Sequence, residues 1–431
     1  MEEMDTPTTT SEDDFPAASV ASPACRFCAA PLTISMVDLG MSPLCESVVL
    51  PEQLDAMEPF YPLHVRVCDR CLLVQLPEYV KPEEIFTEYA YFSGNSDSWV
   101  AHARRYADLM VARYGLGTDD LVVELASNDG YLLGHFVAQG IPVLGVEPAV
   151  NVAAVAVQRG VRTLNRFFGA GTARAIVEEH GHASLVPANN VLAHVPDIND
   201  FVEGIAILLG DGGVATLEFP HVMRLIADNQ FDTIYHEHYS YLSLLTTERI
   251  FAAHGLELVD VEELPTHGGS LRIFARRVGS GREPVSPRVE ALRDAERAAG
   301  LDGLDGYRGY GAQVQATKRE LLDFLHGAQR DGRQVVGYGA PGKGNTLLNY
   351  CAIRADLLRY TVDRNRYKQG TYLPGTHIGV HDPAHLAETR PDYILILPWN
   401  LRDEIAEQLA YTREWGARLV VPIPRLEVFA P

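Results

Sequence analysis

Four ionisable side chains stand next to one another in the run Tyr235-His-Glu-His238. An imidazole titrates near neutrality, and a carboxylate and a phenol beside it can hold or relay a proton. The two histidines are two residues apart and would not share a helix face, so the run is not the HExxH motif of a zinc protease. The run therefore predicts acid–base chemistry by a histidine, with a hydrogen-bonded structural cluster as the alternative.

A second polar group lies in the segment Asn189-Asn-Val-Leu-Ala-His194. The short stretch from Leu185 that precedes it reads as a strand, so the segment is expected on a loop at the carboxyl edge of a parallel sheet, where ligands bind. A single histidine in such a loop is more often structural. His194 is a candidate because we expect its loop to lie opposite the run at Tyr235–His238.

A nucleoside cofactor site is indicated where a strand at 121–125 leads through a tight turn at 127–130 into a helix. The next strand ends about twenty residues further on with an acid suited to ribose hydroxyls. The turn lacks GxGxxG, which favours S-adenosylmethionine over NAD; a turn-stabilising aspartate and a surface glutamate are the alternative. The residues predicted to bind the cofactor are Glu124, Ser127, Asn128, Asp129, Gly130, Glu147, Asn189 and Asn190.

Two CxxC pairs, Cys25–Cys28 and Cys68–Cys71, lie about forty residues apart near the start of the chain. Each pair can turn two thiolates toward one ion, and two pairs complete a closed tetrahedron around zinc. Such a site has no open position, so we expect a structural role; four unligated thiols are the alternative. Cys45 and Cys351 stand alone and are expected to be small apolar residues.

The C-terminal part carries Gly337-Tyr-Gly-Ala-Pro-Gly342 after a predicted strand, and Asp363 ends the next one. Alone, this is a dinucleotide fingerprint. It is not a Walker A loop, because Gly344 follows Lys343 where serine or threonine is required. The loop amides and Lys343 also suit the diphosphate of a nucleotide sugar.

Alternating short apolar runs and helical patterns over 120–278, and again from 334 onward, predict two doubly wound parallel sheets. The net charge of −21 and pI near 5.1 argue against a nucleic-acid polymer as partner. No run is long and apolar enough for a membrane helix, and the acidic start does not resemble a signal peptide, so we expect a cytoplasmic protein.

The chain resembles the deoxysugar C-methyltransferases, which make 3-C-methyl branched sugars of the mycarose type on dTDP carriers. Besides the CxxC pairs and Tyr235-His-Glu-His238, the resemblance rests on a set of motifs spread from Cys25 nearly to the C-terminus. These are Tyr89-Ala-Tyr-Phe-Ser93, Glu124-Leu-Ala-Ser-Asn-Asp-Gly130, Ala188-Asn-Asn-Val-Leu-Ala-His-Val-Pro196, Glu218-Phe-Pro-His221, His267-Gly-Gly-Ser-Leu-Arg272 and Gly342-Lys-Gly-Asn-Thr346.

The resemblance implies roles for these residues. His238 would remove the proton from the sugar carbon beside the 4-ketone, assisted by Tyr235. Tyr89, His194 and Glu237 would line the sugar, with His194 near the developing enolate oxygen. The C-terminal unit would hold the nucleotide-sugar diphosphate through Gly339, Gly342, Lys343 and Asn345.

It also implies the domain order. We expect a disordered tail at 1–22, a zinc-binding module at 23–92, a class I methyltransferase domain that binds S-adenosylmethionine at 93–280, a helical connector at 281–330 and a smaller Rossmann-like nucleotide-sugar domain at 331–431. A monomer is expected, since self-contained domains complete the site.

The predicted function is methylation at C3 of a dTDP-4-keto-deoxyhexose through an enolate formed by a histidine, for a branched deoxysugar of an antibiotic or other glycoside. Two alternatives stay open. The glycine-rich loop could bind NADPH and add or substitute reduction of the 4-ketone. The chain could also bind a nucleotide sugar without chemistry.

Overall fold

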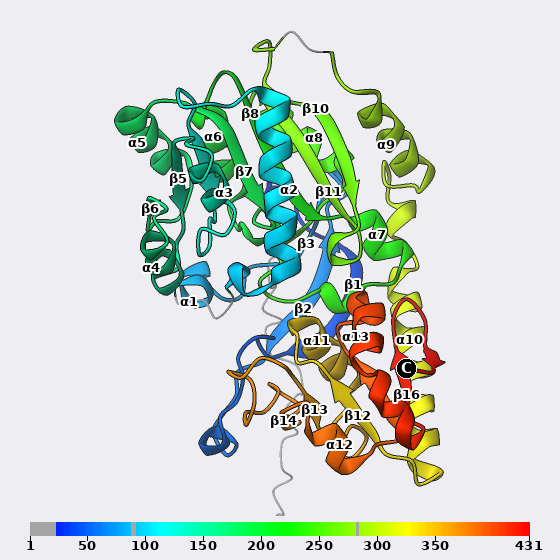
Figure 1. Ribbon diagram of the computed structural model, residues 1–431. Helices are drawn as coiled ribbons and strands as arrows, with labels where there is room; N and C mark the ends of the chain where they lie inside the picture. Colours follow the sequence, from blue (N-terminus) through cyan, green and yellow to red (C-terminus); the bar gives the residue numbers. More distant parts are fainter. Residues whose placement is uncertain (1–22, 88–91, 282–283) are drawn as a thin grey trace, which may run out of the picture.

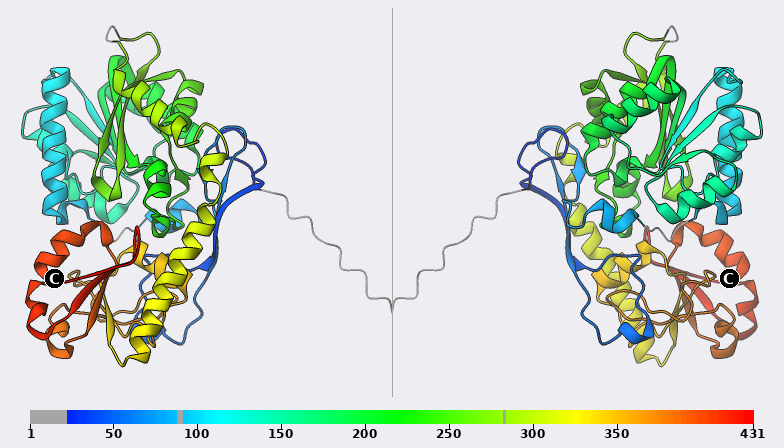
Figure 2. Two further views of the ribbon diagram at one scale, coloured as in Figure 1. Left: turned by 90° about the vertical axis from the view of Figure 1, so that its right-hand side faces the viewer. Right: turned by 90° about the vertical axis from the view of Figure 1, so that its left-hand side faces the viewer.

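The computed structural model describes residues 23–87, 92–281 and 284–431. The predicted tail at 1–22 lies outside these ranges. Figure 1 shows a large central sheet above a smaller C-terminal sheet, with the N-terminal strands between them. In the side views of Figure 2, the N-terminal module runs along one edge and reaches both units. This architecture confirms the predicted fold class.

The N-terminal sheet has the antiparallel order β1-β2-β3-β9. Its strands are β1 (Ile34–Ser42), β2 (Tyr61–Val67), β3 (Val74–Gln75) and β9 (Ser240–Tyr241), followed after β3 by helix α1 (Pro82–Phe86). Alternate residues of β2, Leu63, Val65 and Val67, are buried, as expected for a strand with one covered face. The fourth strand comes from the middle of the chain, directly after His238.

The central sheet has the order β10-β11-β8-β7-β4-β5-β6. Neighbouring strands are parallel except for β11, which is antiparallel to both β8 and β10. The strands are β4 (Val122–Leu125), β5 (Val143–Val146), β6 (Thr163–Leu164), β7 (Ala183–Asn189), β8 (Leu209–Pro220), β10 (Leu256–Leu264) and β11 (Ser270–Arg277).

Helices cover both faces of this sheet, which explains why β4, β5 and β7 are mostly apolar. Successive residues of β4 face opposite sides: Val122 packs with α2 and α3, and Val123 with α5 and α6. The helices are α2 (Asp97–Tyr114), α3 (Leu133–Val137), α4 (Val150–Gln158), α5 (Ala170–His180), α6 (Ile198–Leu208), α7 (Val222–Ala227) and α8 (Leu244–Ala253).

Two helices, α9 (Pro287–Ala298) and α10 (Tyr310–Arg330), lead to the C-terminal sheet. Its order is β14-β13-β12-β15-β16-β17, parallel except for β17. The elements are β12 (Val335–Tyr338), α11 (Gly342–Cys351), β13 (Thr361–Val362), β14 (Val380–His381), α12 (His385–Thr389), β15 (Tyr393–Ile396), α13 (Arg402–Gln408), β16 (Arg418–Val421) and β17 (Glu427–Phe429). The connections reverse direction between β12 and β15, which is where open sheets of this kind bind ligands.

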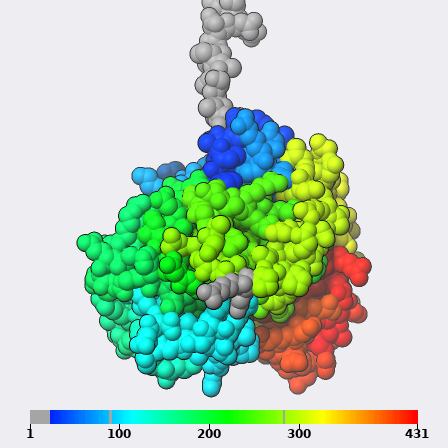
Figure 3. Space-filling view, turned by 90° about the horizontal axis from the view of Figure 1, so that it is seen from above, coloured from blue at the N-terminus to red at the C-terminus, as the bar shows by residue number. Residues whose placement is uncertain are grey.

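The N-terminal module joins the other two units. Seen from above in Figure 3, it borders the central domain and the segment that contains α9 and α10. A loop after β1 packs on the C-terminal unit, where Asn345 Nδ2 donates to the Cys45 carbonyl at 2.6 Å and Val49 pairs with Tyr372. Among the helices of the described ranges, none is both long enough and apolar enough to cross a bilayer.

Candidate active site and zinc cluster

The four cysteines of the CxxC pairs converge on one point. Their sulfur atoms all lie within 4.8 Å of one another, with Cys25 Sγ to Cys71 Sγ and Cys28 Sγ to Cys68 Sγ both at 3.5 Å. A zinc–sulfur bond of about 2.3 Å gives tetrahedral sulfur–sulfur edges of about 3.8 Å, so this donor set fits a zinc ion. Four thiolates would supply every position around the ion, so a bound zinc would hold the module together and leave no place for substrate.

The two CxxC turns share one local geometry. In each, the residue four positions after the first cysteine is left-handed: Ala29 has φ 59° and Leu72 has φ 64°. Its amide donates to the carbonyl of that first cysteine, Cys25 or Cys68. Gln75 supports the first turn, because its Nε2 donates to Cys25 Sγ at 3.1 Å. A group that hydrogen-bonds to a metal ligand without contacting the metal fixes the orientation of that ligand.

The turn after β4 brings the predicted cofactor residues together. Asn128 is left-handed at φ 49°, and its amide donates to Glu147 Oε2 at 2.9 Å, which links the turn to the end of β5. The other carboxylate oxygen of Glu147 accepts from the amide of Ala149 at 2.8 Å. Asp129 pairs with Arg159 at 2.7 Å. The chain therefore fixes three predicted residues by contacts of its own.

Other polar atoms at the same sheet edge lack partners. Within the described part of the chain, no hydrogen bond reaches Glu124 Oε2, Ser127 Oγ, Asn189 Oδ1 or Asn190 Oδ1, although all four atoms are buried. Burial, with Glu147 and Asp129 nearby, raises the pKa of Glu124 well above its ordinary value. Buried polar atoms without partners are costly. These residues therefore fit a polar, positively charged ligand such as S-adenosylmethionine.

The geometry of His238 defines its protonation. Its Nδ1 lies 2.8 Å from the Thr233 carbonyl, which can only accept, so Nδ1 carries the proton and Nε2 keeps a free electron pair. Burial lowers the pKa of His238 well below 6.5, and the neighbouring His194, His267 and Lys343 lower it further. The imidazole is therefore neutral near pH 7, with the form that a general base needs.

The other predicted catalytic side chains gather around this ring. The His194 ring stands nearly perpendicular to that of His238, with centroids 4.8 Å apart, and the Tyr235 ring lies over it at 4.0 Å. Burial lowers the pKa of His194 to about 4, and its Nδ1 is buried without a partner among the described residues. Glu237 is buried in the same run. Tyr89 lies outside the described residues.

The C-terminal unit holds the segment that leads into this run. The indole of Trp399 donates to Asp232 Oδ2 at 2.7 Å, and Thr346 Oγ1 donates to the Ile234 carbonyl at 3.0 Å. On the far side of the run, β9 belongs to the N-terminal sheet. All three units of the chain thus position His238.

The glycine-rich loop after β12 is crowded. A side chain at Gly339 (φ 89°) would meet Pro398, and one at Gly342 would meet Cys45. Asn345 is 3% exposed and bonds the Cys45 carbonyl. Lys343 is partly exposed: its Nζ donates to Asn400 Oδ1 at 2.8 Å and lies 4.7 Å from the centre of the Trp399 ring. Of the four predicted substrate residues, Lys343 is the one with a cation available to a ligand.

His267 is a site residue to which the sequence assigned no role. Its Nε2 lies 3.3 Å from Asn190 Nδ2, and its ring stands 5.4 Å from that of Trp99. The backbone is left-handed (φ 53°, ψ 21°), which is strained for a histidine and is typical of functional positions. The signal was the sequence His267-Gly-Gly, because two consecutive glycines with positive φ mark a tight turn.

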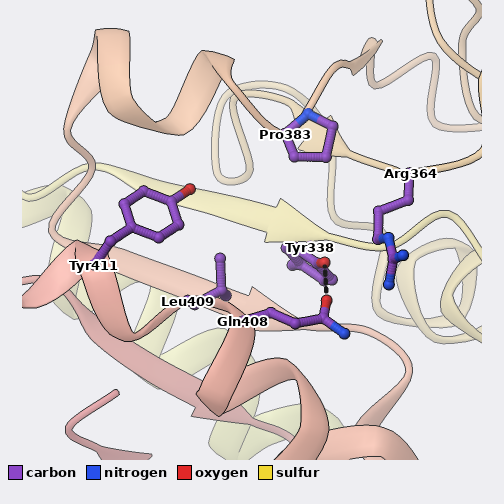
Figure 4. A pocket seen from close by; sticks show the side chains of 6 residues that line it. All are labelled: Tyr338, Arg364, Pro383, Gln408, Leu409 and Tyr411. Atoms are coloured by element: carbon purple, nitrogen blue, oxygen red, sulfur yellow. Dashed lines mark hydrogen bonds between the residues drawn. The ribbon is translucent and has the colours of Figure 1, made fainter.

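A pocket of about 470 Å³ lies on the C-terminal unit, and the Tyr338 hydroxyl in it donates to Gln408 Oε1 at 2.8 Å. Figure 4 shows the side chains that line it. It is lined by Tyr338, Arg364, Pro383, Gln408, Leu409 and Tyr411. None of these six belongs to the residues predicted from the sequence. Arg364 directly follows Asp363 at the end of β13.

Three family models match the chain in order. Residues 25–86 match the "Putative zinc binding domain", 99–261 the "Methyltransferase domain" and 265–424 the "C-methyltransferase C-terminal domain". The second and third matches meet at the end of β10, which pairs with β11 in the central sheet. Together these matches define a class I methyltransferase with an added zinc module and C-terminal unit.

The chain is 37% identical over 406 residues to the C-methyltransferase NovU of Streptomyces niveus, covering 94% of this chain and 96% of that protein. The chain therefore belongs to this family of C-methyltransferases, as the motif resemblance implied.

Solved structures give weaker likenesses. Magnesium protoporphyrin IX methyltransferase (ChlM) of Synechocystis PCC 6803 with bound SAM is 16% identical, covering 44% of this chain and 86% of that chain at a TM-score of 0.32. A SAM-dependent methyltransferase of Anabaena variabilis ATCC 29413 is 15% identical, covering 42% and 86% at a TM-score of 0.34. Both likenesses cover less than half of this chain.

Proposed function

We propose that the protein transfers a methyl group from S-adenosylmethionine to C3 of a dTDP-linked 4-keto-deoxyhexose and so makes a branched deoxysugar of the mycarose type. The observation that carries this proposal is the hydrogen bond between His238 Nδ1 and the Thr233 carbonyl. It leaves Nε2 unprotonated, with the His194 ring 4.8 Å from that of His238.

His238 Nε2 takes the proton from the sugar carbon next to the ketone, and the electrons of the broken C–H bond pass into an enolate. Such a bond is acidic only when the charge can spread to the carbonyl oxygen and be held there by hydrogen-bond donors. We place His194 beside this oxygen, because its ring centroid lies 4.8 Å from that of His238. Tyr235 lies against His238 and assists the proton transfer, while Glu237 and Tyr89 line the sugar.

S-adenosylmethionine, when bound, supplies a sulfonium methyl that a carbon nucleophile can attack in line. The chain's own part is to place the two reactants and to exclude water. We assign the residues at the ends of β4, β5 and β7 to the cofactor, with the buried Glu124 carboxyl among them. Lys343 holds the diphosphate, while Gly339, Gly342 and Asn345 shape the loop around it.

The test is to incubate the full-length protein with dTDP-4-keto-2,6-dideoxyglucose and S-adenosylmethionine and to determine the product by NMR. A new methyl group at C3 is expected. His238→Asn should lower turnover by about a hundredfold to ten-thousandfold, the range for general-base catalysis, and leave cofactor affinity within about twofold. Product methylated on oxygen, or full turnover by the variant, would reject the proposal.

Reduction of the ketone by NADPH is the second candidate, favoured by the pocket that Arg364 lines near the glycine-rich loop (Figure 4), since an arginine there can hold a 2′-phosphate. Against it, Asp363 Oδ2 accepts from the Ala340 amide within that loop. Mass spectrometry after incubation with labelled NADPH distinguishes the two. Hydride in the product would establish the reductase, and unlabelled, methylated product supports transfer alone.

A further inference from the structure

Arg26 lies inside the first CxxC turn, yet its side chain reaches away from the cysteines. Its backbone amide donates to Gln75 Oε1 at 2.9 Å, and the same glutamine contacts Cys25 Sγ. The guanidinium donates to the Pro196 carbonyl at 2.8 Å and to the Leu76 carbonyl. It also lies 5.3 Å from the centre of the Tyr239 ring. The planar, charged guanidinium of Arg26 thus connects the zinc cluster to three separate segments of the chain.

These contacts fall next to both histidines of the site. Pro196 follows His194 by two residues, and Tyr239 directly follows His238. Leu76, which accepts from Arg26, itself donates to the Tyr239 carbonyl at 3.0 Å.

A backbone bond joins the two histidine segments directly. The Tyr239 amide donates to the Ala193 carbonyl at 2.8 Å, immediately before His194. Arg26 therefore contacts the chain on both sides of a backbone bond that links the two histidine segments.

We propose that Arg26 is a positioning residue for catalysis. Its contacts with Pro196, Leu76 and Tyr239 connect the zinc cluster to the two histidine segments and so hold His194 and His238 at a fixed spacing. The inference rests on the proposed function of the two histidines. It makes the zinc module part of the catalytic machinery, although no cysteine touches a reacting atom. The two ring centroids are 4.8 Å apart, so a shift of about 1 Å in either segment is a large fraction of their separation and can cost about a hundredfold in rate.

The experiment compares Arg26→Met with Arg249→Met in the full-length protein. Arg249, on α8, is a matched control because its Nη1 donates to the Cys71 carbonyl at 3.1 Å, so it grips the other CxxC turn without touching either histidine segment. For Arg26→Met we expect kcat to fall about tenfold to a hundredfold. The KM for the nucleotide sugar, the Kd for S-adenosylmethionine and the zinc content per chain should stay within about twofold of wild type.

A readout independent of activity is hydrogen–deuterium exchange at the Tyr239 amide, which should accelerate in Arg26→Met and not in Arg249→Met. Arg26→Lys, which keeps the charge and one hydrogen bond, should be intermediate in both measurements. Wild-type kcat and exchange in Arg26→Met would overturn the inference. So would loss of zinc together with weaker cofactor binding in both Arg26 variants, since Arg26 would then serve folding alone.

His238→Asn, assayed beside these variants, separates the two proposals. If it retains full turnover, the proposed function has failed, whatever the exchange data show. If it is inactive while Arg26→Met is normal, only the role of Arg26 is lost.

Discussion

The chain contains two strand–turn–helix units of the kind that bind nucleotides, one after β4 and one after β12. Both turns lie at the carboxyl edge of a parallel sheet, and both use residues with positive φ. They differ in how their polar groups are satisfied. After β4, Glu124 and Ser127 keep buried atoms without partners among the residues that the structure covers.

After β12, polar groups of the turn are bonded by other residues of the protein. Asp363 accepts from the Ala340 amide, and Lys368 Nζ donates to the Ala340 carbonyl at 2.8 Å. Gly339 packs against Pro398. The turn with the better fingerprint is therefore the one whose backbone groups the chain bonds itself, although Asn345 Oδ1 is buried without a partner among the described residues. A sequence motif predicts the backbone conformation of a turn. The polar groups that the protein leaves without hydrogen bonds indicate whether the turn binds a ligand.

The largest difference between the two turns should appear in cofactor affinity when Glu124→Gln is compared with Asp363→Asn. Replacing the Glu124 carboxyl, whose unpartnered Oε2 we assign to the cofactor, should raise the Kd for S-adenosylmethionine about tenfold to a hundredfold, because an unsatisfied buried polar group costs about 1–3 kcal/mol. Asp363→Asn should leave this Kd unchanged. Isothermal titration calorimetry of both variants measures it; a reversed ranking would show that the turns have been assigned the wrong way round.

A smaller effect tests how tightly the second turn is filled. Gly339→Ala forces a left-handed alanine against Pro398, where the new Cβ would lie 2.6 Å from Cδ, so we expect a loss of about 1–3 kcal/mol in the free energy of unfolding. Gly332→Ala, also left-handed but with open space around it, should lose less. Urea unfolding gives both values. Equal losses would mean that the turn has room to adapt.

A further effect concerns the histidines of the proposed site. Burial lowers the pKa of folded His194 to about 4, against about 6.5 in the unfolded chain, so the unfolded state binds more protons between these values. Its contribution to stability is therefore present above pH 6.5 and is lost as the pH falls toward 4. Stability of His194→Asn should decline less steeply than wild type over this range in thermal unfolding at several pH values. Parallel curves would show that His194 protonates freely in the folded protein.

Local patterns predicted much of this architecture. The four cysteines converge as their spacing indicated, and parallel sheets form in both regions where apolar runs alternate with helical patterns. The pairing of Ser240 and Tyr241 with β3 was not predicted, because a two-residue strand from another domain leaves no periodic pattern. The left-handed His267 also escaped prediction, because its conformation depends on contacts with residues distant in sequence.

The most direct test of the central claim is exchange of the sugar's C3 proton with deuterated water, followed by NMR without S-adenosylmethionine. The wild-type protein should exchange this proton in its dTDP-4-keto-deoxyhexose substrate, because a neutral His238 can form the enolate before any methyl group is present. His238→Asn should show only the background rate. Undiminished exchange in the variant would contradict the account, since another group would then be the base.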